Sequence, residues 1–269
     1  MAISRPAQQN SIATKMQVRK WYSQLAESTQ TLTDWTFMNY GYSDSESDAD
    51  ISLEGLDEWN RYPLQLYHHL ASKLPLKDAE LLDIGSGRGG GADYIARTFP
   101  VEFVTGVDLS REAVALCQKL HQGNKRVDYV QGDAESLPFT NESFDAIMSV
   151  EATHCFVSIE RFLREASRVL RSQGQLVITD FRTPKSFEVF FEQINASAFE
   201  VMSTQDISEN VVLALDKDNE RKEEFCRQFL KGDVSTQFPH FAALRGSQTY
   251  QDFISGNYLY KTIHLKRST

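Results

Sequence analysis

The sequence predicts an α/β fold in which a parallel β-sheet carries helices on both faces. Two observations support this prediction. Short apolar runs alternate with segments of helical periodicity between residues 80 and 181. The first apolar run ends in a glycine-rich turn, Gly85-x-Gly87-x-x-Gly90, which leads directly into a helical segment. Strands that alternate with helices of this length are typical of a parallel sheet covered on both sides.

The central part of the chain contains five expected strands and three expected helices. The strands are expected over 80–85, 102–110, 127–133, 143–150 and 174–181. Helices are expected over 91–99, 111–122 and 160–171, where apolar residues recur on one face.

The flanking segments follow a different pattern. Aromatic, amphipathic stretches at 15–28 and 58–74 predict two helices before the sheet. After residue 181 we expect an aromatic helix, a short strand, a charged helix over 216–232 and a late strand over 257–267 that could run antiparallel. The chain is therefore divided into an N-terminal lid with helices (1–75), a central core (76–183), and a cap insertion with C-terminal strands (184–269), all within one domain.

Composition excludes several classes of protein. The net charge of −9 argues against a protein that grips a nucleic-acid backbone. No apolar run approaches the roughly 18 residues of a membrane span, and the first 15 residues lack the apolar region of a secretory signal. The three widely spaced cysteines indicate neither a disulfide framework nor a zinc site. A cytoplasmic enzyme without a metal is the simplest expectation.

The glycine-rich turn predicts an adenosine cofactor, and the surrounding acids indicate which one. Asp108 ends the second strand, 23 positions after Gly85, where a carboxylate can accept from both ribose hydroxyls. To this point NAD and S-adenosylmethionine (SAM) fit equally. Asp83 suits a ligand with an ammonium group, and Asp133 with Ala134 can frame an adenine ring. Because Arg88 is the lone basic residue in the turn, a pyrophosphate site is disfavoured, and the combination favours SAM.

Four successive segments resemble the motifs of class I SAM-dependent methyltransferases. They are "LLDIGSGRGG", "VTGVDLS", "VQGDAESLPFTNESFDAIMSVEATHCF" and "FLREASRVLRSQGQLVITDF", in the family's order over about a hundred residues. The segments "MNYGY", "RYPLQLYHHLA" and "VEATHCF" are similar to the small-molecule subgroup, which includes phthiotriolone/phenolphthiocerol dimycocerosate and sterol methyltransferases. The resemblance implies a Rossmann-like sheet of seven strands with an antiparallel last strand.

The resemblance also implies roles for individual positions. Asp83, Gly85, Ser86 and Gly87 would line the methionine and ribose portions of SAM. Leu109 would pack on the adenine, Ser149 and Val150 would pass beneath the sulfonium, and Gln65 would reach the methionine carboxylate. The expected partner is a small-molecule acceptor, bound by a monomer or homodimer.

The catalytic and substrate residues are expected near the end of the fourth strand and in the capping segments. His154 lies close to that strand end, and a neutral imidazole there could act as a base or position the substrate. The alternative is a histidine that hydrogen-bonds the loop. Glu151 could orient His154, contact substrate or cap a helix. Trp21, Tyr22, Tyr40 and His240 fall in segments expected to cover the sheet and to contact an apolar acceptor.

The sequence leaves three functions open. The first is methylation of a small, hydrophobic or aromatic natural-product or lipid-like acceptor, with oxygen favoured over nitrogen or carbon. The second is an enzyme of the same fold that retains SAM while catalysing another reaction, such as a cyclisation. The third is a non-catalytic scaffold, which the intact cofactor motifs disfavour.

Overall fold

The computed structural model describes residues 12–45, 51–230 and 232–268. It contains a single seven-stranded sheet with the strand order β3-β2-β1-β4-β5-β7-β6. The strands are β1 (Glu80–Ile84), β2 (Phe103–Asp108), β3 (Val127–Gln131), β4 (Phe144–Val150), β5 (Leu170–Arg182), β6 (Phe199–Asp206) and β7 (Leu259–Arg267). Strand β7 pairs antiparallel with both β5 and β6, whereas β1 to β5 pair in parallel. The expected sheet with an antiparallel last strand is confirmed.

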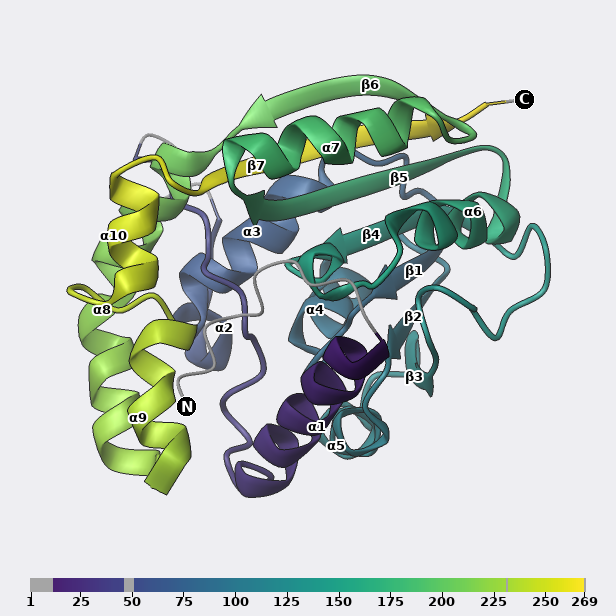
Figure 1. Cartoon of the computed structure of the whole chain (residues 1–269). Coiled ribbons are helices and arrows are strands. Elements are labelled where there is room, and N and C mark those ends of the chain that lie inside the picture. The colour runs from purple at the N-terminus through teal and green to yellow at the C-terminus, as the bar shows by residue number, and fades with distance from the viewer. Residues whose placement is uncertain (1–11, 46–50, 231, 269) are drawn as a thin grey trace.

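Helices cover the sheet and its carboxyl-terminal edge (Figure 1). They are α1 (Ile12–Ser28), α2 (Gly55–Trp59), α3 (Arg61–Ala71), α4 (Gly90–Thr98), α5 (Arg111–Leu120), α6 (Ile159–Val169), α7 (Pro184–Asn195), α8 (Ser208–Phe229), α9 (Gly232–Phe241) and α10 (Gln248–Ile254), with a 3₁₀ turn η1 (Thr153–Cys155).

Alternation along the strands creates two apolar faces. Leu81 and Leu82 are adjacent and fully buried, yet they belong to different clusters because successive strand residues point to opposite faces. The Leu81 face packs against α3, α4, α8 and α10. The Leu82 face packs against α6 and α7. Because both faces are covered at the centre of the sheet, β1 and β4 are buried along nearly their whole length, as parallel strands usually are.

A third cluster lies apart from the sheet. It joins α1 and the segment 29–42, which we call the N-terminal strap, to α8 and α9 through residues such as Leu25, Trp35, Phe225 and Phe238. In Figure 1 the strap and α1 run beneath the carboxyl ends of the strands, and α8, α9 and α10 stack along one side of them. The N-terminal and C-terminal parts of the chain thus meet over the same edge of the sheet.

The structure differs from the sequence expectations mainly after residue 206. Helix α8 begins eight residues earlier than the predicted charged helix, and α9 and α10 were not predicted. Pro239 lies inside α9, where a proline normally argues against a helix. The parts of the predicted N-terminal lid that fall in 1–11 and 46–50 lie outside the described residues.

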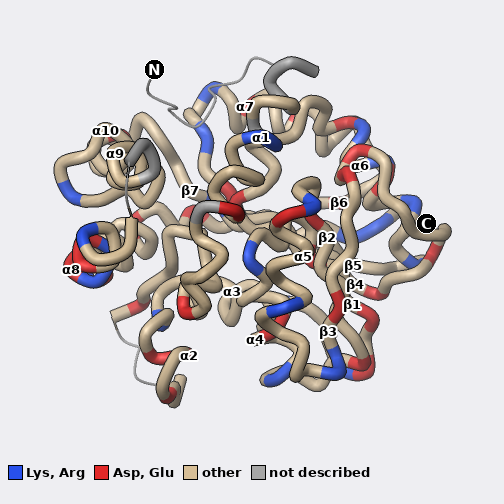
Figure 2. The backbone as a smooth tube through the Cα atoms, turned by 90° about the horizontal axis from the view of Figure 1, so that it is seen from below, with Lys and Arg blue, Asp and Glu red and all other residues tan. Residues whose placement is uncertain are grey.

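The helices that the structure describes are all too short or too polar to cross a membrane. Helix α8, at 22 residues, is the longest of them, and basic and acidic residues are interspersed along it (Figure 2). Its buried positions include Val211, Ala214 and Leu215, so α8 is an amphipathic surface helix.

Candidate cofactor and substrate site

The glycine turn after β1 brings backbone close to two other segments. Gly85 and Gly87 both have positive φ angles, +80° and +55°, which side-chain-bearing residues rarely adopt. A Cβ on Gly85 would lie 2.4 Å from the Ala152 Cβ, and one on Gly87 would lie 2.5 Å from the Met38 Cε. The turn therefore leaves room for a ligand only because these positions have no side chain.

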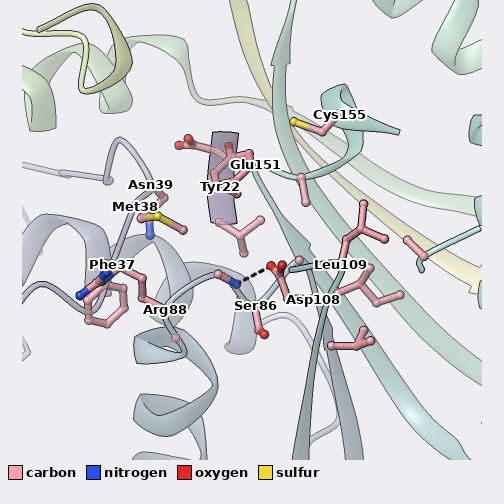
Figure 3. Close-up of a pocket in the computed structure, with 18 of the residues that line it drawn as sticks. Tyr22, Phe37, Met38, Asn39, Ser86, Arg88, Asp108, Leu109, Glu151 and Cys155 are labelled. Carbon is pink, nitrogen blue, oxygen red and sulfur yellow. Dashed lines mark hydrogen bonds between the residues drawn. The ribbon is translucent and has the colours of Figure 1, made fainter. Parts of the chain in front are cut away.

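Asp108 ties the end of β2 to this turn. Its Oδ2 accepts a hydrogen bond from the Gly87 N–H at 3.0 Å (Figure 3). Its Oδ1 accepts from the Ser110 N–H at 2.9 Å. Burial raises the pKa of Asp108 to about 6, although these backbone donors favour the charged form. At neutral pH the carboxylate is therefore ionised and able to accept further hydrogen bonds.

The turn opens into a cavity at the carboxyl ends of β1, β2 and β4. We call it the cofactor cavity. Of the residues expected to hold SAM, those that line it are Gly85, Ser86, Gly87, Asp108, Leu109, Asp133, Ala134 and Val150. The structure thus brings together four segments that are up to 65 residues apart in sequence, at the edge where open α/β sheets bind ligands.

Local hydrogen bonds shape the adenine-side wall. The Asp133 Oδ1 accepts from the Glu135 N–H at 2.9 Å, which turns the chain after β3. Glu135 is buried, and its Oε1 accepts from the Val157 N–H at 3.0 Å. This bond holds the 151–158 loop, so that Phe156 and Ala134 both border the cavity.

Asp83, Ser149 and Gln65 lie behind the wall instead of on it. Asp83 is fully buried next to the Tyr67 hydroxyl, and burial together with the nearby Asp108 charge raises its pKa to about 7. The Ser149 Oγ donates to the Ile84 carbonyl at 3.2 Å, which fixes β4 to β1. Gln65 is buried within α3. None of the three borders the cofactor cavity that the described residues form.

Arg88 fixes the N-terminal strap over the glycine turn. It is 2% exposed, and its guanidinium donates to the Trp35 carbonyl, to the Thr29 Oγ at 2.9 Å and to the Leu32 carbonyl at 2.8 Å. It also stacks on the Trp35 ring at 4.8 Å. The lone basic residue of the turn therefore binds backbone carbonyls of the strap, and this explains why Thr36, Phe37, Met38 and Asn39 form one wall of the cavity (Figure 3).

Glu151 lines the cofactor cavity but does not orient His154 as one alternative expected. Its Oε1 accepts from the Tyr40 N–H at 2.6 Å and from the Tyr260 hydroxyl at 2.8 Å. The carboxylate therefore joins the strap, β4 and β7 at one point. Its backbone has a positive φ of +49°, and strained conformations of this kind often occur at functional sites.

The expectation of a neutral His154 imidazole is wrong. Its Nδ1 lies 2.8 Å from the Asp180 Oδ1, and the Asp180 Oδ2 accepts from the Thr153 hydroxyl and the His154 N–H. Burial lowers the histidine pKa, but attraction to the Asp180 carboxylate outweighs burial and raises the pKa to about 9. The ring packs on Phe181 and does not border the cofactor cavity that the described residues form.

Of the four expected substrate residues, only Tyr22 borders the cavity. The Trp21 Nε1 donates to the Gln237 Oε1 at 3.2 Å and so joins α1 to α9. Tyr40 is buried against Phe181 and Phe253, and His240 is exposed on α9. Sequence reasoning missed several lining residues, namely Thr36, Phe37, Met38, Asn39, Tyr67, Cys155 and Phe156. The aromatic, irregular stretch from 34 to 42 was the available signal for the strap.

Comparison with known proteins agrees with this geometry. A methyltransferase-domain family model matches residues 82–178, which hold the glycine turn, Asp108 and Asp133. The phthiotriol/phenolphthiotriol dimycocerosates methyltransferase of Mycobacterium tuberculosis is 31% identical over 266 residues, which cover 97% of both chains. The fatty-acid O-methyltransferase of Mycolicibacterium smegmatis is 36% identical over 184 residues, 68% of this chain and 66% of that one.

The [4+2]-cyclase SpnF has a similar crystal structure, with a TM-score of 0.71, 20% identity, and coverage of 95% of this chain and 96% of that one. At this identity the likeness shows the fold alone. The Mycobacterium tuberculosis relative is matched along 97% of both chains, and the glycine turn and its acids line the cavity. These two findings show the family as well as the fold. The chain belongs to the family of SAM-dependent methyltransferases.

Proposed function

We propose that this methyltransferase transfers a methyl group from SAM to an oxygen atom of an apolar, lipid-like acceptor. The observation that carries the proposal is the cofactor cavity, which combines the SAM-type turn and acids with an apolar wall from the strap. The choice of acceptor is supported by the relatives, one named for phthiotriol lipids and one for fatty-acid O-methylation.

In this proposal different residues of the cavity bind different parts of the cofactor. Asp108 accepts from the ribose hydroxyls, since its ionised carboxylate lies at the end of β2. Asp133 accepts from the adenine amino group, while Ala134 and Leu109 lie against the ring. Gly85, Ser86 and Gly87 let the methionine portion approach the backbone. Asp83 acts from behind, as a buried acid beneath the turn.

When bound, SAM supplies an electrophilic methyl group on its sulfonium. The remaining catalytic work is to align an acceptor oxygen with that methyl and to keep water away. As its O–C bond forms, a hydroxyl acceptor also loses its proton, which passes to the Glu151 carboxylate on the cavity wall. The strap serves alignment and the exclusion of water, because Phe37 and Met38 cover the turn and Arg88 holds the strap in place. The buried Glu151 bond to the Tyr40 N–H fixes the same strap beside the expected position of the methyl group.

A methyl-transfer assay tests the proposal. The protein is incubated with methyl-labelled SAM and a matched panel of long-chain alcohols, phenols, fatty acids and amines. We expect label in an ether or ester product, and much less of it from the Asp108→Ala variant at a cofactor concentration close to the wild-type dissociation constant. Label confined to amines or to carbon would overturn O-methylation, and SAM binding without transfer to any class would overturn the methyltransferase activity on such acceptors.

A further inference from the structure

A second, smaller cavity lies beside the cofactor cavity. It lies between the strap, α3, α8 and α9. Its lining residues are Trp35, Phe37, Met38, Asn39, Pro63, Arg221, Lys222, Phe225, Phe238, Phe241 and Ala242. Phe37, Met38 and Asn39 border both cavities, so these three residues form the junction between them. We call the second space the apolar cavity.

The surface that this cavity offers is aromatic. Trp35 packs on Phe225 and Phe238, with ring centroids 5.2 and 5.9 Å apart. Phe241 and Ala242 complete the wall from α9. None of the residues expected to bind SAM borders this space within the described chain. It therefore suits an apolar part of the acceptor more than any part of the cofactor.

The two cations in the wall are paired within the protein. The Arg221 guanidinium binds both oxygens of Asp218 at 2.6 Å. The Lys222 Nζ lies 3.4 Å from the Asp218 Oδ2 and donates to the Tyr40 carbonyl at 3.4 Å. Asp218 offsets one of these two positive charges, and the Glu151 carboxylate attracts Lys222 as well. Because both cations already face carboxylates, they do not by themselves make the apolar cavity an anion site.

Asn39, at the junction, has a buried side-chain acceptor that no described residue satisfies. Its side chain is 9% exposed, and its Nδ2 donates to the Pro63 carbonyl at 3.2 Å. A carbonyl can only accept, so this bond determines which atom of the amide is nitrogen. The Oδ1 is consequently the other atom, and it is buried with no hydrogen-bond partner among the described residues. A buried acceptor of this kind is costly unless a ligand supplies the missing donor.

We propose that the Asn39 Oδ1 accepts a hydrogen bond from the hydroxyl group of the acceptor, whose apolar remainder occupies the apolar cavity. This inference rests on the proposed O-methylation and names its substrate class, an apolar alcohol or phenol. An amide oxygen cannot bind an ionised carboxylate, because neither group supplies a hydrogen. Glu151, on the wall of the cofactor cavity, adds a carboxylate that repels an anionic acceptor.

The junction also explains why this contact orients the reacting group. Met38 lies against Gly87, where the cofactor is expected, and Asn39 follows it in the chain. A hydroxyl whose hydrogen points to the Oδ1 keeps its oxygen lone pairs available for the methyl group. Asn39 is thus a substrate-binding residue that selects for a hydroxyl.

Calorimetry on the protein saturated with S-adenosylhomocysteine tests the inference without requiring turnover. Decan-1-ol and decanoic acid serve as probes at pH 7.5. We expect decan-1-ol to bind more tightly than decanoic acid, and Asn39→Leu to weaken decan-1-ol binding by roughly three- to tenfold, the effect of one net hydrogen bond. The affinity for S-adenosylhomocysteine itself should change less than twofold.

Asn60→Leu is the matched control. Asn60 is 1% exposed, and its Nδ2 donates to the Leu56 carbonyl at 2.9 Å, but it borders neither cavity. It should leave the affinity for decan-1-ol unchanged. A second variant, Ala242→Phe, fills the apolar cavity and should weaken binding of decan-1-ol more than that of butan-1-ol, even if Asn39→Leu does not fold.

Three results would overturn the inference. The first is tighter binding of decanoic acid than of decan-1-ol, and the second is unchanged decan-1-ol binding by folded Asn39→Leu. The third is a loss of S-adenosylhomocysteine binding in Asn39→Leu as large as its loss of decan-1-ol binding, which would make Asn39 a cofactor contact. Absence of decan-1-ol binding to the wild type would overturn it as well. If the alcohol binds through Asn39 but no methyl is transferred, the proposed function fails and the binding site stands.

Discussion

At the scale of single residues, His154 and Asp180 form a buried ion pair close to the end of β4. The pKa of the histidine is raised to about 9, and that of the aspartate lies well below its ordinary value. Arg182 lies near the same carboxylate, with its Nη2 3.8 Å from the Asp180 Oδ2. Since the imidazolium is already protonated at neutral pH, it cannot remove a proton from the acceptor as a general base.

The ion pair predicts a specific dependence of stability on pH. Because the histidine pKa is raised on folding, its contribution is fully present below pH 6.5 and is lost as the pH rises through about 9. His154→Gln should lower the free energy of unfolding by on the order of 3 kcal/mol at pH 6 and by much less at pH 10. Urea denaturation at both pH values measures this. An equal loss at both would show that the pair does not titrate in this range.

Asp108 predicts a different dependence, that of cofactor affinity on pH. Its pKa is raised to about 6, so the carboxylate becomes protonated as the pH falls through that value and loses acceptor capacity. Wild-type affinity for S-adenosylhomocysteine should therefore fall below pH 6. Asp108→Ala should weaken binding by roughly 1.5–3 kcal/mol at pH 7.5 and largely remove this pH dependence. A variant that binds as tightly as the wild type in calorimetry contradicts the assignment.

At the scale of elements, the N-terminal strap is held from both ends. Arg88 binds its carbonyls at residues 29, 32 and 35, and Glu151 binds the Tyr40 N–H. Burial lowers the pKa of Arg88 to about 10, which leaves it charged at neutral pH. Arg88→Met should keep the sheet folded, increase amide exchange over residues 29–40, and weaken cofactor binding by about 1–3 kcal/mol. Unchanged exchange in the strap would show that the guanidinium is dispensable there.

Helix α1 predicts a separable effect on turnover. The Ser23 hydroxyl donates to Glu112 at 2.6 Å, and Trp21 packs on Phe241, so α1 bridges α5 and α9. Deletion of residues 1–30 removes this bridge together with Thr29, a partner of Arg88. The far-ultraviolet circular dichroism of the sheet should persist while methyl transfer falls. Full activity of the truncated protein would reduce α1 to a packing element.

The elements that the sequence predicted well are those with local signals. The glycine turn, Asp108 and Asp133 each follow directly from a strand end, so spacing along the chain locates them. The partners of Glu151, which was left with three possible roles, could not be predicted because Tyr40 and Tyr260 are more than a hundred residues away. His154 was expected to be neutral because its partner, Asp180, lies on another strand. Long-range pairing of this kind leaves no periodic trace in a sequence.

At the scale of the whole molecule, ligand binding and folding are coupled. The cofactor cavity is lined by α1, the strap, α3, three strands and the 151–158 loop, so it exists only when the N-terminal segments are packed on the sheet. S-adenosylhomocysteine at 100 times its dissociation constant should stabilise the fold by about 2.7 kcal/mol. Thermal denaturation should show a rise of several degrees, and Asp108→Ala at the same ligand concentration should show less. An equal rise in both would mean that the ligand binds elsewhere.

The position of β7 has a consequence for how this protein is made. The strand lies between β5 and β6, although it is the last to leave the ribosome. Until residues 259–267 emerge, β5 has an open edge and β6 has no neighbour to pair with. Helices α8, α9 and α10 lie between β6 and β7 in the chain, so the walls that α8 and α9 give the apolar cavity are also synthesised late. A nascent chain that stalls before residue 259 therefore exposes the unpaired edge of β5, which is prone to aggregate. We expect it to depend on chaperones until residues 259–267 have been synthesised.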